Sequence, residues 1–98
     1  MKITRLFLAA TAAVALATSV AHAQTKTVAI TAIVEHPALD ATRDGVIDAL
    51  KVAGFTPGQN LKVDYQSAQG NPATAAQIAR QFVGARPDVI VPISTPSA

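Results

Sequence analysis

The amino-acid sequence predicts an α/β fold, the start of a doubly wound parallel sheet, and three observations support this prediction. The apolar, β-branched run at 27–34 is typical of a parallel strand that is buried on both faces, and a second apolar run at 88–93 predicts another strand. The segment 61–67 alternates between apolar and polar residues, which is typical of a strand with one solvated face. Two segments with helical spacing separate the three strands, and this alternation predicts a parallel sheet with right-handed crossovers.

The first strand and helix are predicted between residues 27 and 54. Residues 27–34 (TVAITAIV) form the strand, and Pro37 suits the first turn of a helix, where a backbone N–H has no partner to lose. We expect Gly54 to follow the C-terminus of this helix and Pro57 to lie in a turn. Helical spacing separates an apolar face from a charged face. These faces consist of Leu39, Val46, Leu50 and Ala53, and of Asp40, Asp44, Asp48 and Lys51.

The second helix is predicted from residue 72, with Asn71 as its N-cap and Pro72 as its first residue. We expect Gly84 and Pro87 to end it. Its apolar residues recur at i, i+3, i+4, i+7 and i+8, which indicates an amphipathic helix; they are Ala75, Ile78, Ala79, Phe82 and Val83.

The third strand, residues 88–93, contains Pro92, which has no N–H for a central strand. We therefore expect a bulge at Pro92, or the start of the next loop, and a third helix that opens at residues 94–97. The half-polar second strand belongs at an edge, so the predicted order is 2-1-3. The third strand would then have an open apolar edge, from which we expect the chain to be the front of a longer protein.

Residues 1–23 have the three parts of a secretory signal peptide: a basic start, an apolar run at 6–20 and a small-x-small site that ends at Ala23. A transmembrane anchor is the alternative, but the run of about 15 residues is shorter than the roughly 20 that a bilayer requires. We expect cleavage between Ala23 and Gln24. Because the chain has no cysteine to carry a lipid anchor, we expect a protein of the Gram-negative periplasm.

Composition argues against several classes of function. Without Lys2 and Arg5, six cations balance six anions, and aromatic residues make up 4% of the chain, so nothing indicates nucleic-acid binding. No nucleophile elbow, dinucleotide fingerprint or phosphate-binding loop is present, and we expect neither catalysis nor a cofactor. The carboxylates of Asp40, Asp44 and Asp48 and the lone His36 are better interpreted as a solvated helix face and a cap or loop residue than as metal ligands.

Ligands of open parallel sheets bind beyond the carboxyl ends of the strands, where the strand order reverses. In the order 2-1-3, this point lies between the loops 35–40 and 94–97. Helix N-termini there suit a ligand carboxylate, and Asp40 could accept from an ammonium group. His36 could donate a hydrogen bond or stack. The hydroxyl groups of Ser94, Thr95 and Ser97 add donors and acceptors. Helix capping alone is the alternative.

These loops also carry a family resemblance. The chain resembles bacterial ABC-transporter substrate-binding proteins, in the branch related to tryptophan and tyrosine uptake, and the His36-Pro37-x-x-Asp40 and Thr95-Pro96 pieces are the most distinctive. The matching segments are residues 34–41 (VEHPALDA) followed by Gly45, 67–71 (SAQGN), 76–79 (AQIA), 88–91 (DVIV) and 94–98 (STPSA).

This resemblance implies a periplasmic binding protein-like type I fold, in which two α/β lobes close on a small amino-acid-like or related organic solute. Residues 24–98 would be the N-terminal part of the first lobe, with the second lobe absent. The implied partner is an ABC permease of the inner membrane, and we expect a monomer when the protein is complete. The implied ligand contacts are His36, Leu39, Asp40, Ser94, Thr95 and Ser97, with Gln69 as a weaker candidate.

Two other interpretations remain open at this point. An exported α/β enzyme could carry its catalytic residues beyond Ala98. The 98-residue product could also be a truncation that does not fold stably by itself, because its third strand is open and it has no disulfides.

Overall fold

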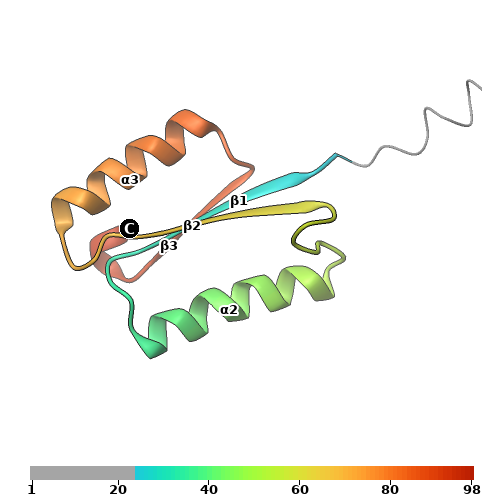
Figure 1. Ribbon diagram of the computed structural model, residues 1–98, viewed down its shortest axis with the longest axis horizontal. Helices are drawn as coiled ribbons and strands as arrows, with labels where there is room; N and C mark the ends of the chain where they lie inside the picture. Colours follow the sequence, from blue (N-terminus) through green and yellow to red (C-terminus); the bar gives the residue numbers. More distant parts are fainter. Residues whose placement is uncertain (1–23) are drawn as a thin grey trace, which may run out of the picture.

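The computed structural model describes residues 24–98, and the predicted signal peptide lies outside the described residues. The described chain forms a three-stranded sheet with one helix on each face (Figure 1). No helix in this part of the chain is both long enough and apolar enough to span a bilayer. The elements are β1 (Lys26–Ala32), α2 (Pro37–Val52), β2 (Leu61–Ser67), α3 (Pro72–Ala85), β3 (Val89–Ile93) and the 3₁₀ turn η1 (Thr95–Ser97).

All strand pairs are parallel, and the order is β2-β1-β3, which confirms the predicted topology. The register places Ile30 of β1 opposite Tyr65 of β2 and Val91 of β3. Since α2 and α3 cover opposite faces, alternate residues of β1 pack against different helices. We call these two sides the α2 face and the α3 face.

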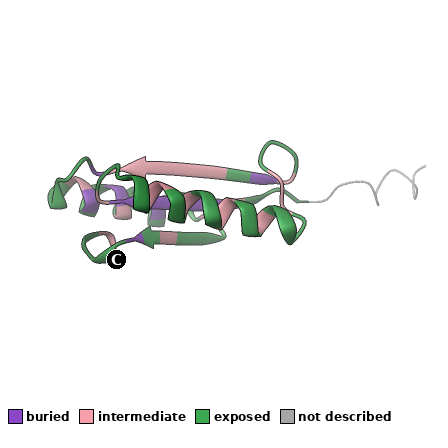
Figure 2. Ribbon diagram, turned by 90° about the horizontal axis from the view of Figure 1, so that it is seen from below, coloured by how far each residue is buried: buried purple, intermediate pink, exposed green. Residues whose placement is uncertain are grey.

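The core is divided between these faces. On the α2 face, partly buried side chains surround the buried residues Val28, Ile30, Ala32, Leu61 and Ile93. On the α3 face, the buried residues are Ala29, Ala68, Ala75, Ile78 and Phe82. The two helices contribute unequally, because α2 has no fully buried residue whereas α3 has three (Figure 2).

Some residues predicted on the apolar helix faces are exposed instead. Ala53 is the C-cap of α2, so it lies beyond the last turn that contacts the sheet. Val83 follows the buried Phe82 by one position, and the 100° step between neighbours on a helix turns it toward solvent. Ile47, which the pattern did not single out, packs against the α2-face core.

The end of α2 follows the prediction for Gly54. Its φ is +98°, its N–H donates to the Lys51 carbonyl at 3.0 Å, and the Phe55 N–H donates to the Leu50 carbonyl at 2.8 Å. This pair of bonds is a Schellman motif, which satisfies carbonyls that the helix leaves free. It also directs Phe55 back onto the α2-face core.

Other predicted boundaries are wrong. β1 ends at Ala32 rather than at residue 34, and α3 continues through Gly84 to Ala85, where Arg86 caps it with a φ of +52°. Pro92 lies inside β3, opposite Thr31, rather than in a bulge or loop. Within the described residues β3 pairs only with β1, and such an edge strand tolerates a residue without an N–H.

The N-terminal ends of β1 and β3 are joined by two reciprocal hydrogen bonds. The Thr27 N–H donates to Asp88 Oδ2 at 2.8 Å, and the Asp88 N–H donates to the Thr27 carbonyl at 2.9 Å. The two residues are 61 positions apart in the chain. Asp88 therefore fixes the register of the third strand against the central strand.

Replacing Asn71 with alanine is expected to lower the free energy of unfolding by about 1 kcal/mol. Asn71 Oδ1 accepts from the N–H groups of Ala73 at 2.9 Å and Thr74 at 3.3 Å, so alanine leaves both donors at the start of α3 without this partner. Urea denaturation measures the change. Asn71→Asp is the control, because it keeps the accepting oxygen, and an equal loss in both variants would contradict the capping role.

Candidate functional site

The loops that follow the three strands lie together at one end of the sheet (Figure 1). The Ala68 N–H donates to the Ala32 carbonyl at 2.9 Å, and the Gly70 N–H donates to the Ile33 carbonyl at 2.6 Å. These bonds hold the loop after β2 against the end of β1. The turn η1 packs against α3 and β3, so residues 94–97 lie at the same end.

His36 is the N-cap of α2. Its Nδ1 atom accepts from the Ala38 N–H at 3.1 Å, which satisfies one of the free donors of the helix. A ring nitrogen that accepts carries no proton, so the neutral ring has its proton on Nε2. His36 is exposed, and Nε2–H is therefore the group that could donate to a ligand.

Leu39 and Asp40 follow in the first turn of α2, and both are half-buried. Leu39 packs against the α2-face core. The Asp40 Oδ1 atom lies 3.8 Å from a terminal nitrogen of Arg43, one turn farther along the same helix. A carboxylate in the first turn also complements the positive end of the helix dipole.

Arg43 and Tyr65 extend this cluster, and sequence reasoning missed both. Arg43 Nε donates to Asp44 Oδ1 at 3.1 Å, and its guanidinium carbon lies 4.7 Å from the centre of the Tyr65 ring. The hydrogen bond to Asp44 raises the pKa of Arg43 above its ordinary value, aided by the charges of Asp44 and Asp40. The i, i+3 spacing of Asp40 and Arg43 was the available signal.

The segment after β3 is a short 3₁₀ turn, so the expected third helix extends over only three residues of the described chain. Ser94 has a φ of +72° and a ψ of 157°, a conformation that non-glycine residues rarely adopt and that clusters at functional sites. The Ser94 side chain makes no capping hydrogen bond, so its hydroxyl group is not used for capping η1. The Oγ atom of Ser97 is buried and has no hydrogen-bond partner.

Gln69 lies in the loop after β2 and is exposed, with a φ of +54°. The structure therefore places all the sequence-predicted ligand residues at one end of the sheet. Of these residues, only Asp40 approaches the cluster of Arg43 and Tyr65, through its ion pair with Arg43. Within residues 24–98, no hydrogen bond or ion pair connects residues 36–40 with residues 94–97, and no group of three potential metal-ligating side chains is found.

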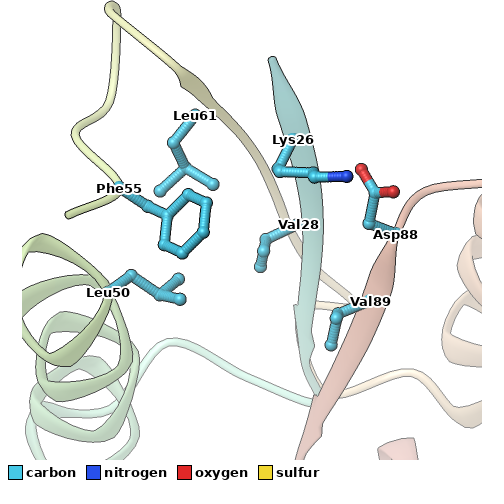
Figure 3. Close-up of a pocket in the computed structure, with 7 residues that line it drawn as sticks. All are labelled: Lys26, Val28, Leu50, Phe55, Leu61, Asp88 and Val89. Atoms are coloured by element: carbon cyan, nitrogen blue, oxygen red, sulfur yellow. The ribbon is translucent and has the colours of Figure 1, made fainter. Parts of the chain in front are cut away.

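A cavity of about 230 Å³ lies at the opposite end of the sheet, on the α2 face (Figure 3). Its lining is mostly apolar and includes the side chains at the N-terminal ends of all three strands. The lining residues are Lys26, Val28, Leu50, Phe55, Leu61, Asp88 and Val89. This cavity contains none of the predicted ligand residues.

The chain matches a known protein family. Residues 27–98 match the family model for ABC transporter substrate binding proteins. The chain belongs to that family. The match spans both predicted ligand loops and all of the sheet except Lys26, and members of this family act outside the cytoplasm, in the periplasm or at the cell exterior.

One curated relative of the chain is a tyrosine-binding protein from Clostridioides difficile. It is 45% identical over 73 residues, which are 74% of this chain and 21% of the relative. The chain therefore spans about a fifth of the length of that protein.

Three solved structures share the fold, each over 76% of this chain and 25% of the other. A conserved domain protein from Vibrio cholerae is 62% identical with a TM-score of 0.74. The ligand-free, open form of a substrate binding protein with adhesive properties from Clostridium difficile is 49% identical with a TM-score of 0.73. An ABC domain from Streptococcus pneumonia in complex with L-Trp is 28% identical with a TM-score of 0.70.

Proposed function

We propose that the complete protein containing this chain is the solute-binding component of an ABC transporter, and that it binds a tyrosine- or tryptophan-like amino acid for uptake. The observation that carries this proposal is the 45% identity to a tyrosine-binding protein, which extends over almost the whole of the described chain. The L-Trp complex of a more distant relative supports the same class of ligand. Residues 24–98 would form the N-terminal part of the first of two lobes.

An amino acid presents one carboxylate and one ammonium group, and the loops offer partners for both. The N–H group of Leu39, for which the first turn of α2 provides no partner, and the hydroxyl groups of Ser94, Thr95 and Ser97 suit the carboxylate. The Asp40 carboxylate suits the ammonium group, with His36, Leu39 and Gln69 as further contacts. Closure of a second lobe over this surface would exclude water and retain the solute.

The protein would act by capture and release, without catalysis and without a cofactor, and would deliver its solute to a permease of the inner membrane as a monomer. Cleavage between Ala23 and Gln24 would release it without a lipid anchor, because no cysteine is present to carry one. A soluble protein of this kind would be retained by the outer membrane of a Gram-negative cell. The tyrosine-binding relative comes from a Gram-positive organism, in which no outer membrane would retain the protein, so that relative would have to be held at the cell surface by other means.

Titration calorimetry of the complete protein with L-tyrosine and L-tryptophan tests this function. We expect saturable binding of at least one of them. Asp40→Ala should weaken it by about tenfold to a hundredfold, since a hydrogen bond to a charged group contributes about 1.5–3 kcal/mol. Thr95→Val, which removes a hydroxyl group at nearly constant shape, should weaken binding less.

The control is Asp48→Ala, which removes an exposed carboxylate two turns farther along α2. It should leave the affinity unchanged. Failure of both amino acids to bind would refute the proposed function. Binding that Asp40→Ala and Thr95→Val leave unaltered would refute only the assignment of the site.

A further inference from the structure

Arg43 is held from three directions by side chains of α2 and β2. Asp44 accepts from its Nε at 3.1 Å, Asp40 lies 3.8 Å from one of its terminal nitrogens, and the Tyr65 ring lies 4.7 Å from its guanidinium carbon. Its side chain is 26% exposed, whereas that of Lys51, the other cation of α2, is 52% exposed. Arginine stacks on an aromatic face and pairs with carboxylates at the same time, so this position uses properties that lysine lacks.

The two oxygens of Asp40 have different surroundings. Oδ1 is buried and has no hydrogen-bond partner, and the hydroxyl group of Tyr65, whose ring contacts Arg43, is also buried without one. The Asp40 side chain as a whole is nevertheless 36% exposed. Because Oδ1 contributes almost nothing to that exposure, the exposed surface belongs to the rest of the side chain, in the first turn of α2. Arg43 thus attracts one oxygen inward and leaves the rest of the carboxylate toward solvent.

The charges of this cluster favour one chemical class of ligand group. Two carboxylates, Asp40 and Asp44, surround the single cation Arg43, so the cluster carries a net negative charge. A second carboxylate would be repelled there, whereas an ammonium group would be attracted. The ammonium group of an amino acid is therefore the ligand group that fits the exposed side of Asp40.

We propose that Arg43 is a positioning residue, which fixes the Asp40 carboxylate through the Asp40–Arg43–Tyr65 cluster so that its free oxygen receives the α-ammonium group of the ligand. This proposal rests on the proposed function and names the ligand group that this side of the site selects. Arg43 itself does not touch the ligand. It acts by preventing the carboxylate from turning away or pairing elsewhere.

The test compares L-tyrosine with its deaminated analogue, 3-(4-hydroxyphenyl)propionate, as probes of the complete protein. In Arg43→Met, the affinity for L-tyrosine should fall about tenfold, the loss that corresponds to one charge-assisted contact, while the affinity for the analogue stays within twofold. Arg43→Lys keeps the positive charge but loses the planar guanidinium group that stacks on Tyr65. Its affinity for L-tyrosine should therefore lie between those of the unmodified protein and Arg43→Met. Lys51→Met removes the cation of the other i, i+3 pair of α2, at 3.9 Å from Asp48, and should change neither affinity.

The possible results separate the hypotheses. An equal loss for both probes in Arg43→Met would show a merely structural role and overturn the proposal. Unchanged affinity for L-tyrosine in Arg43→Lys and Arg43→Met would also overturn it, and the lysine variant decides alone if the methionine variant does not fold. Failure of the unmodified protein to bind L-tyrosine, L-tryptophan or the analogue would refute the proposed function, and this proposal with it.

Discussion

Replacing Phe82 with alanine is expected to lower the free energy of unfolding by about 3–5 kcal/mol. Phe82 is 1% exposed and is the largest side chain of the α3-face core. Three of its four buried neighbours in that core are alanines (Ala29, Ala68 and Ala75), whose short side chains cannot move into the space that a ring leaves. The loss is a large part of the roughly 5–15 kcal/mol by which natural domains are stable.

Urea denaturation followed by circular dichroism measures this loss. Val83→Ala is the matched control, because Val83 is the next residue of the same helix and is 67% exposed. It should change the free energy of unfolding by no more than about 0.5 kcal/mol. Similar losses at the two positions would mean that α3 does not pack on the sheet through Phe82.

Ile30→Ala is expected to cost about 2–5 kcal/mol on the opposite side of the sheet. Ile30 lies in the middle of the central strand, is 0% exposed, and is flanked on both sides by paired strands. Alanine also has a lower strand propensity than isoleucine, which adds to the loss of packing.

The control for Ile30 is Val52→Ala on α2, where the side chain is 91% exposed. Denaturation midpoints should therefore fall clearly for Ile30→Ala and barely for Val52→Ala. The unfolding curves of the two single variants also show whether the two faces unfold together: one cooperative transition in each variant supports a single unit. A separate transition for each face would contradict it.

The topology could be predicted because the number of buried faces of a strand determines the pattern of apolar residues within that strand. The unbroken apolar run of β1 indicates a central strand and the alternating run of β2 indicates an edge strand, in agreement with the observed order β2-β1-β3. The run of β3 is also apolar, but within the described residues β3 is an edge strand and most of it is exposed. Ends of elements were less predictable. Whether α3 ends at Gly84 or at Ala85 depends on which residue can adopt a positive φ, and Arg86 does so although its type gives no sign of it.

The candidate site was predictable at the level of loops rather than of side chains. Strand order determines which loops meet, so residues 36–40 and 94–97 could be named in advance. The pairing of Arg43 with Asp40 was indicated only by their i, i+3 spacing, and Tyr65 could not be named, because its contact with Arg43 depends on how α2 packs over β2. Asp40 was singled out from the sequence as a ligand residue, whereas the burial of its Oδ1 atom depends on the packing around the first turn of α2.

The position of β1 has a consequence for the time course of folding. β1 is the first strand in the chain and the middle strand in the sheet. The two hydrogen bonds between Thr27 and Asp88 can form only when Asp88, 61 positions later in the chain, is available. Parallel pairings between distant segments form slowly, because the connecting chain must be ordered first. A chain that emerged from a narrow pore with its N-terminus first would thus keep its central strand unpaired on one side until Asp88 had followed. During such a passage, the topology would delay folding and make completion of the sheet a late event.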